Sequence, residues 1–267
     1  MHSRALAWSV AAFVCLLSAR PARAAGSVTC SAVTAAGVPL KVITIPLENL
    51  DIKVTGQMPK WGAGHAEPFG QMIRRTRPAV AVTGTFFSTR TLKPIGDIVI
   101  GGQLAHFGGL GTALCITDNN EVEFIRPERY RHQDWSRFDF VLCSGPRLVR
   151  GGMVAVDPRS EGFRDRRLFQ PAARLAIGAT RDRRLVIVAT RKPVHLSRLA
   201  RAMRAIGVVD AINLDGGSSL GLYCRGKMLM RPGRWLTNLL VVYEDRWHYE
   251  NVRESLLPIE MRQASSR

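Results

Sequence analysis

The 267-residue chain is 46% hydrophobic and 22% charged, which is typical of a globular domain with a core of its own. It contains no solenoid repeat and no low-complexity segment. Lys and Arg number 38 against 21 Asp and Glu, which gives a formal charge of +17. Such a charge can attract phosphates, anionic glycans or nucleic acid. Because the arginines are spread along the chain, a well-solvated surface explains them better than a nucleic-acid patch, and no nucleic-acid partner is expected.

Residues 1–24 have the features of a signal peptide. Arg4 supplies a short positive region, residues 5–17 are apolar, and Ala22-Arg23-Ala24 fits a cleavage site. The apolar run is shorter than the roughly 20 residues that a membrane-spanning helix needs, and no later segment is long and apolar enough. We therefore expect an exported protein, periplasmic or secreted, without stable membrane insertion.

The segments that follow are mostly short apolar runs separated by turn residues, which is the pattern of β-hairpins. In the three clearest hairpins, pairs of strands flank Asp118-Asn119-Asn120, Arg181-Asp182-Arg183 and Arg225-Gly226. Further strands are expected at 37–45, 49–54, 79–82, 97–100, 138–143, 147–152, 208–214 and 238–243. Loops are expected at 56–70 and at 157–171, and the second of these is polar, arginine-rich and mobile.

One helix is clear, at 196–206, and Gly207 suits its C-terminal end. Its apolar side chains recur at steps of three and four residues and form one stripe: Leu196, Leu199, Met203 and Ile206. A helix of one or two turns is also expected at 71–77, before Pro78.

With many hairpins and few helices, the chain is predicted to be a single α+β domain of β-hairpins in mixed sheets. The domain is expected to cover residues 28–245, with a polar C-terminal tail at 246–267. The helix at 196–206 leads into the strand at 208–214 and so delivers the segment that follows this strand.

That segment, 211–219, has the most concentrated chemistry in the chain. Its apolar strand ends at Asp215, and Gly216, Gly217, Ser218 and Ser219 follow. Glycine lets a ligand approach the backbone closely, and successive N–H groups in such a turn can bind an anion. The sequence therefore predicts the floor of an active site here. The alternative is a tight Asp-Gly turn between two strands.

A second notable segment is Thr83-Gly84-Thr85-Phe86-Phe87, which follows the strand at 79–82. Thr83 and the backbone of Gly84 can face a ligand, while one phenylalanine, with Phe87 as the candidate, stacks on a sugar. The alternative is that both phenylalanines belong to the core.

No metal site and no cofactor are expected. The chain has no CxxC pair, and its histidines are scattered without ligand spacing. Oxygens of Asp215, Asn238 and the backbone could hold a hard cation, but nothing in the spacing requires one. Apart from Cys15 in the presumed signal peptide, the cysteines are Cys30, Cys115, Cys143 and Cys224. An oxidising compartment permits disulfides among these four in three pairings, and free buried thiols are the alternative.

Motifs of common serine hydrolases, zinc proteases and nucleotide-binding folds are absent. What remains is a carboxylate at a strand end, small hydroxyl side chains, glycine-rich backbone and arginines. This set suits a phosphate or a sugar, because a guanidinium matches phosphate oxygens and Asp215 can act as general acid or base if its pKa is shifted. Sugar hydrolysis usually uses two carboxylates. Asp97 is a candidate for the second only because it follows the segment 83–87.

Five segments, taken in order, resemble the motifs of the phosphodiester glycosidase family. The most specific is Asn213-Leu214-Asp215-Gly216-Gly217-Ser218-Ser219, which follows a helix as it does in the family. The other four are less specific by themselves: Thr83-Gly84-Thr85-Phe86-Phe87, Gly145-Pro146-Arg147-Leu148-Val149, Arg174-Leu175-Ala176-Ile177-Gly178 and Asn238-Leu239-Leu240. The resemblance covers residues 40–243.

The resemblance implies hydrolysis of a sugar-1-phosphodiester to a free sugar and a phosphomonoester. It implies that Asp215 and Arg174 are catalytic, with Arg174 holding the phosphate, and that Asn238 positions the sugar. It also implies that glycines and a serine shape the site: Gly145, Gly216, Gly217 and Ser218. The expected substrate and partner is a phosphate-linked sugar or glycan of the cell envelope or of an exopolysaccharide.

The chain departs from the family pattern at three positions. Thr83 stands where the family has Asn, Thr85 where it has Gly, and Leu175 where it has Thr. At the first position, an amide that donates and accepts becomes a smaller hydroxyl. Two hypotheses therefore stay open. One is an exported sugar-1-phosphodiester hydrolase, and the other is a non-catalytic envelope protein that binds an anionic glycan with the same fold.

Overall fold

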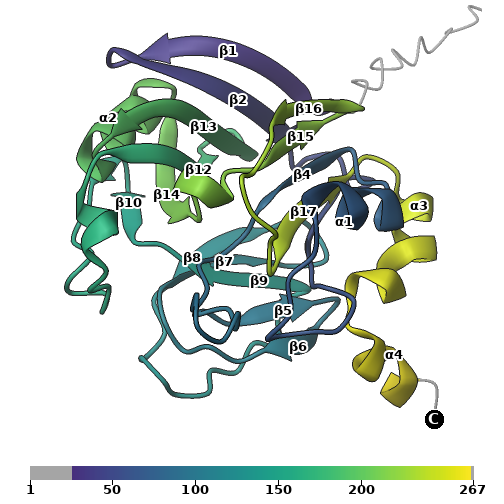
Figure 1. Cartoon of the computed structure of the whole chain (residues 1–267). Coiled ribbons are helices and arrows are strands. Elements are labelled where there is room, and N and C mark those ends of the chain that lie inside the picture. The colour runs from purple at the N-terminus through teal and green to yellow at the C-terminus, as the bar shows by residue number, and fades with distance from the viewer. Residues whose placement is uncertain (1–25, 266–267) are drawn as a thin grey trace, which may run out of the picture.

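A computed structural model describes residues 26–265, which form three antiparallel β-sheets around a shared core (Figure 1). The predicted signal peptide, 1–24, lies outside the described residues. The single α+β domain of β-hairpins with few helices is confirmed. The sheets were expected to be mixed, but every strand pair among the described residues is antiparallel, as hairpin connections favour.

The largest sheet has seven strands, and apolar side chains cover both of its faces. Along its longest strand, β13 (Arg184–Val194), Leu185 and Ile187 face the shared core, whereas Val186 and Val188 pack beneath α2 (Leu196–Ala205). This alternation follows from the two-residue period of a strand. In spatial order the strands are β1 (Thr29–Ala35), β2 (Val38–Pro46), β13 (Arg184–Val194), β12 (Ala172–Thr180), β14 (Val208–Leu214), β10 (Arg147–Arg150) and β11 (Met153–Val154).

Two five-stranded sheets close the core from the other side. Val82 and Leu240 from the second sheet and Phe140 from the third are buried in the same cluster as Ile187. The second sheet comprises β16 (Lys227–Met230), β15 (Leu222–Cys224), β4 (Val80–Thr83), β17 (Leu239–Tyr243) and β3 (Lys53–Gln57). The third comprises β6 (Gln103–His106), β5 (Ile98–Ile100), β9 (Phe140–Ser144), β7 (Thr112–Ile116) and β8 (Val122–Ile125).

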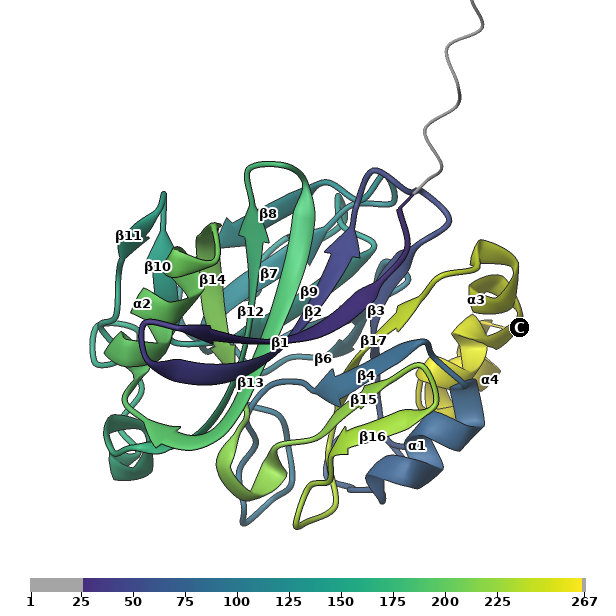
Figure 2. The same cartoon turned by 90° about the horizontal axis from the view of Figure 1, so that it is seen from above.

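The helices lie outside the sheets. Figure 2 shows α1 (Phe69–Thr76), α3 (Arg246–Val252) and α4 (Ile259–Ser265) together on the side opposite α2. Short 3₁₀ turns are η1 (Arg166–Phe169), η2 (Gly217–Ser219) and η3 (Arg253–Leu256). The segment expected as a polar tail after residue 245 is helical, and it adds apolar side chains to the core: Tyr249, Leu256 and Leu257.

The three hairpins and the helix that the sequence predicts are confirmed. The helix α1 overlaps the predicted range 71–77 and begins two residues earlier. The strand predicted at 49–54 is wrong. Asn49 accepts a hydrogen bond from the backbone N of Asp51 with its side chain (3.1 Å) and from that of Ile52 with its carbonyl (3.2 Å). This local turn competes with a strand, and so β3 begins only at Lys53.

The described residues contain no helix that is long and apolar enough to cross a membrane. Over the same part of the chain, no group of three or more His, Cys, Asp or Glu side chains is placed to hold a metal ion. The four cysteines from Cys30 to Cys224 are free thiols, and all but Cys30 are buried.

Candidate active site

Asp215 lies where the first and second sheets meet. It follows β14, whose residues Ala211 to Leu214 are fully buried, and β14 is held between β12 and β10. The backbone N of Asp215 donates to the carbonyl of Gly84 (3.0 Å), which is the first residue after β4. The carboxylate is therefore mounted on backbone that both sheets hold in place.

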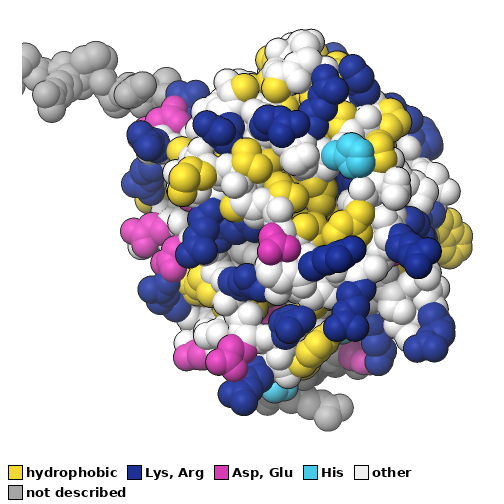
Figure 3. Space-filling view, turned by 90° about the vertical axis from the view of Figure 1, so that its left-hand side faces the viewer, with side chains coloured by type: hydrophobic (Ala, Val, Ile, Leu, Met, Phe, Trp, Pro, Cys, Tyr) yellow, Lys and Arg dark blue, Asp and Glu magenta, His cyan; other side chains and the backbone are white. Residues whose placement is uncertain are grey.

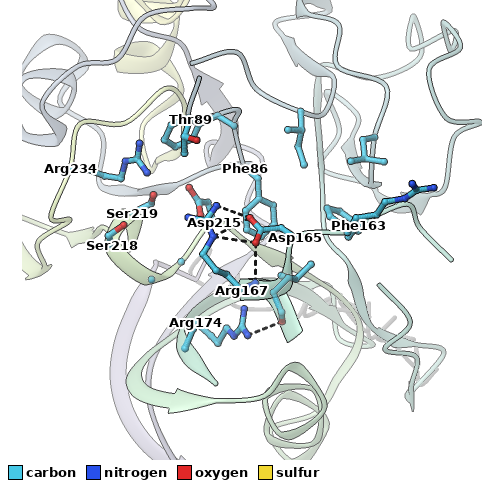
Figure 4. Close-up of a pocket in the computed structure, with 18 of the residues that line it drawn as sticks. Phe86, Thr89, Phe163, Asp165, Arg167, Arg174, Asp215, Ser218, Ser219 and Arg234 are labelled. Atoms are coloured by element: carbon cyan, nitrogen blue, oxygen red, sulfur yellow. Dashed lines mark hydrogen bonds and ion pairs between the residues drawn. The ribbon is translucent and has the colours of Figure 1, made fainter. Parts of the chain in front are cut away.

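A cavity of about 360 Å³ opens above this junction (Figure 4). Four parts of the chain supply most of its walls: residues 86–95, residues 162–174, residues 215–219 and Arg234. Figure 4 shows Asp215 with Arg234 on one side and the Asp165–Arg167 pair on the other. Asp215 thus shares a small cavity with several guanidinium groups and with a second carboxylate, that of Asp165.

Burial raises the pKa of Asp215 to about 7. A hydrogen bond with the Ser219 side chain, the positive charge of Arg234, the backbone N–H of Gly216 and the charge of Arg167 all act in the opposite direction, but burial outweighs them. Near neutral pH, Asp215 is therefore able both to hold and to give up a proton, which is the property that acid–base catalysis requires.

Arg174 is buried in the wall of the cavity at the start of β12. Its Nε donates to the carbonyl of Val194 (3.2 Å), and its Nη2 donates to the carbonyls of Leu168 (3.0 Å) and Gln170 (2.5 Å). Burial lowers the pKa of Arg174 to about 10, so the guanidinium keeps its charge at neutral pH. It forms no ion pair within residues 26–265, so no described carboxylate neutralises its positive charge.

Two further arginines line the cavity from opposite sides. Arg167 forms an ion pair with Asp165 (2.7 Å). The hydrogen bonds that the Arg167 side chain donates lower the pKa of Asp165. Arg234 lies over the ring of Phe87, with 4.5 Å between its guanidinium carbon and the ring centroid. The arrangement combines an aromatic face, a fixed positive charge and an ionised carboxylate around Asp215.

The residues proposed from the sequence fall into two sets. Asp215 and Arg174 line the cavity, as do Phe87, Gly216, Gly217 and Ser218. Thr83, Gly84, Gly145 and Asn238 are outside its walls and support the backbone that carries the first set. Their predicted contacts with substrate stay predictions.

Asn238 and Gly84 form one interlocked unit beneath the cavity. The Asn238 side chain accepts from the backbone N of Thr85 (2.7 Å) and donates to the carbonyl of Thr85 (3.1 Å). A Cβ on Gly84 would come within 2.0 Å of the Asn238 Oδ1, so only glycine fits there. The glycine of this motif therefore allows a side chain to bind the neighbouring backbone.

Thr83 and Gly145 also hold backbone near Asp215. The Thr83 hydroxyl donates to the carbonyl of Ser219 (2.5 Å) and accepts from the backbone N of Gly221 (3.0 Å). The backbone N of Gly145 donates to the carbonyl of Asn213 (2.8 Å), two residues before Asp215. Both contacts fix the two ends of the segment that contains Asp215.

Asp97, the candidate for a second carboxylate, does not line the cavity. It is 1% exposed and accepts from the backbone N–H groups of Gly108 (2.9 Å) and Gly109 (2.8 Å) and from Nε1 of Trp135 (3.0 Å). These three hydrogen bonds replace those that water would make to the carboxylate, so Asp97 has a structural role. The second carboxylate in the cavity is Asp165.

The model of the phosphodiester glycosidase family matches residues 76–243, which contain all the cavity segments named above. The chain belongs to the phosphodiester glycosidase family. No curated protein matches the sequence.

Solved structures share the fold at low sequence identity. A hypothetical protein from Synechocystis is 18% identical with a TM-score of 0.70, over 80% of this chain and 61% of that one. The catalytic domain of zebrafish N-acetylglucosamine-1-phosphodiester alpha-N-acetylglucosaminidase, auto-inhibited by its pro-peptide, is 19% identical with a TM-score of 0.65, over 81% and 82%. A Burkholderia pseudomallei protein described as exported is 13% identical with a TM-score of 0.56, over 77% and 74%.

Several residues that line the cavity were not predicted from the sequence. Asp165 and Arg167 come from the segment 157–171, which was expected to be a mobile loop, and Arg234 comes from the turn before β17. The signal that could have found the first two was the density of arginine in that segment. Phe163 and Leu168 interrupt it, and their burial fixes the segment against the cavity.

Proposed function

We propose that the protein is an exported hydrolase that cleaves a sugar-1-phosphodiester into a free sugar and a phosphomonoester. Membership of the phosphodiester glycosidase family supports hydrolysis of a glycosidic phosphodiester. The signal-peptide features of residues 1–24 support export, where a phosphate-linked glycan of the cell envelope or an exopolysaccharide is the available substrate.

The observation that carries the proposal is the position of Asp215, with its pKa raised to about 7, in a cavity that also contains Arg174, Arg167 and Arg234. The substrate phosphodiester carries one negative charge, which the buried charge of Arg174 and the two rim arginines would attract. The ring of Phe87, held under Arg234, would lie against the sugar.

In the proposed reaction, water attacks the sugar carbon C1 while Asp215 takes a proton from that water. The bond between C1 and the phosphate oxygen breaks, and its electron pair leaves with the phosphomonoester. Because the second pKa of a phosphomonoester is about 6, this leaving group departs without needing a proton. One deeply placed carboxylate acting as general base would therefore suffice, with the arginines stabilising the charge on the departing phosphate.

A screen of sugar-1-phosphodiesters tests the proposal. Each compound is incubated with the protein, a phosphatase then releases phosphate from any phosphomonoester formed, and the released phosphate is measured. We expect turnover of at least one compound by the wild-type protein and a loss of about 10²–10⁴-fold in Asp215→Asn, the contribution usual for a general base.

The competing hypothesis is a protein that binds an anionic glycan without cleaving it. It predicts that calorimetry detects binding of the same compounds to both proteins while neither releases phosphomonoester. That result would reject the hydrolase and retain the fold as a glycan-binding domain.

A further inference from the structure

A second hollow of about 420 Å³ adjoins the cavity. Phe163 and Arg164 line both, so the two spaces share a wall. The other residues of the second hollow are Arg159, Arg166 and Phe169. All five come from the arginine-rich segment between β11 and β12.

Only arginine and phenylalanine line this hollow. Within residues 26–265, none of its three arginines forms an ion pair, and the nearby acidic side chains are paired elsewhere. The carboxylate of Asp165 binds Arg167, and that of Glu161 accepts from the Thr112 hydroxyl (2.6 Å) and from the backbone N of Arg147 (2.7 Å). The third nearby acid, Asp157, accepts from the backbone N of Ser160 (3.2 Å), so the hollow concentrates three guanidinium groups without an ion-pair partner among the described residues.

The backbone that carries these arginines is held in place. Phe163 and Leu168 are buried, Arg174 binds the carbonyls of Leu168 and Gln170, and the Asp165 side chain accepts from the backbone N of Arg167 (2.9 Å) at the start of η1. The guanidinium carbon of Arg159 lies 5.5 Å from the centroid of the Phe169 ring. Although the three arginine side chains are exposed, the backbone that carries them is ordered before binding, so an anion bound there orders less of the chain than it would on a free loop.

The location of the hollow indicates which part of a substrate would enter it. It adjoins the wall formed by 162–174, where Arg167 and Arg174 would hold the phosphate, and it is lined by no residue from the turn at 215–219. A group that continues beyond the phosphate, away from the sugar, would therefore reach it. Figure 3 shows the side of the molecule with α2, on which Lys and Arg side chains are spread widely and Asp and Glu are fewer.

We infer that the second hollow binds a second anionic group of the substrate, on the leaving-group side, and that the natural substrate is a glycan chain with repeated negative charges. This inference rests on the proposed function. The guanidinium groups would bind a phosphate, sulfate or carboxylate, and the two phenylalanines would cover the carbon chain between the charges.

The test compares matched substrates in the full chain. N-acetylglucosamine 1-phosphate esterified to glycerol carries one charge site, and two derivatives carry a terminal phosphate or a terminal carboxylate on the glycerol. We expect the terminal charge to lower KM by about tenfold relative to the glycerol compound and to leave kcat similar. A tenfold change is of the size that hydrogen bonds to a charged group contribute. A gain with phosphate alone indicates a phosphate-linked chain, and a gain with both indicates an acidic chain in general; both support the inference.

Two double variants separate the hollow from the overall charge. Arg159→Ala/Arg166→Ala removes two guanidinium groups from the hollow, and Arg201→Ala/Arg204→Ala removes the same charge from the exposed side of α2. The first is expected to abolish the tenfold gain and the second to keep it, with both melting temperatures close to that of the wild type. Equal KM values for all three compounds in the wild type, or an equal loss in both variants, would overturn the inference.

Failure of the proposed function gives a different result. If the wild type cleaves none of the three compounds, their affinities are measured by calorimetry with Asp215→Asn at two salt concentrations. A tighter, salt-sensitive affinity for the doubly charged compounds that Arg159→Ala/Arg166→Ala removes would still support the second anion site. Equal affinities would reject that site as well.

Discussion

Asp97 and Asp215 both lie beside apolar strands and glycine-rich segments, but their surroundings are opposite. Asp97 is closed off and accepts hydrogen bonds from three N–H groups. Asp215 is half-buried at the floor of a cavity, and burial raises its pKa to about 7. Both carboxylates accept hydrogen bonds, but only Asp215 opens onto a cavity, so access to a ligand separates the carboxylate that can react from the one that holds structure.

The same contrast divides the rest of the site. Beneath the cavity, the side chains of Thr83 and Asn238 bind backbone groups, those of Ser219 and Gly221 for Thr83 and those of Thr85 for Asn238. Arg174 and Arg234 instead line the cavity, and neither forms an ion pair with a described side chain. The motifs that resemble the family thus contribute mainly to a rigid frame, and the frame presents a few reactive groups.

The largest effect on the frame is expected from Gly84→Ala. The new Cβ would lie 2.0 Å from the Asn238 Oδ1, so the Asn238 side chain would have to move away. The buried backbone groups of Thr85 that it binds would then have no partner. Urea unfolding should show a loss of about 3–5 kcal/mol, or no folded protein. The matched control is Gly70→Ala in α1, where a methyl fits and helix propensity favours alanine by about 1 kcal/mol. A Gly84→Ala protein as stable as wild type would contradict the frame.

Asp97→Asn tests the structural carboxylate. The amide replaces an acceptor with a donor that faces N–H groups, so we expect a loss of about 2–4 kcal/mol in urea unfolding and an unchanged kcat/KM for the folded fraction. A fall in kcat/KM without loss of stability would instead give Asp97 a role in the reaction.

Arg234→Ala tests a side chain that lines the cavity. Because Arg234 lies over Phe87 and is half-exposed, its loss should raise KM about tenfold and change the melting temperature little. Arg231→Ala, three residues earlier and exposed, is the control for a general loss of charge and should leave KM as it is. Equal KM values for the two variants would remove Arg234 from the substrate site.

The smallest expected effect concerns stability and pH. Because the folded-state pKa of Asp215 is raised above its usual 3.8, the folded protein holds a proton that the unfolded chain has lost, and stability falls as pH rises from about 4 to 7. Asp215→Asn removes this penalty and should be more stable than wild type at pH 8, by about 1 kcal/mol. Thermal unfolding of both proteins at pH 5 and 8 measures it, and a less stable variant at pH 8 would contradict the raised pKa.

Local patterns predicted much of the fold. Apolar runs on either side of turn residues predict the hairpins around 118–120, 181–183 and 225–226, and the apolar stripe predicts α2. The strand at 49–54 failed because Asn49 and Asp51 form a turn that alternation does not reveal. The helices after residue 245 were missed because their buried side chains are separated by charged ones. An exposed polar tail has the same sequence pattern, and only the tertiary packing distinguishes the two.

The site was only partly predictable for a different reason. Asp215 and its glycines are adjacent in sequence, so one segment contains them. Asp165, Arg167 and Arg234 reach the cavity from segments that no local pattern links to Asp215, and only tertiary packing brings them together. Conversely, whether Asn238 faces a sugar or the backbone of Thr85 depends on a contact across 153 positions of the sequence.

The most direct test of the account is the pH dependence of kcat/KM for a sugar-1-phosphodiester that the screen identifies. If Asp215 is the general base, it must be ionised, so log kcat/KM should rise with slope 1 up to an apparent pKa near 7 and then level off. Asp215→Asn should lose activity and this limb together. A rate that falls through pH 7, or an Asp215→Asn protein with the wild-type rate and pH profile, would contradict the central claim.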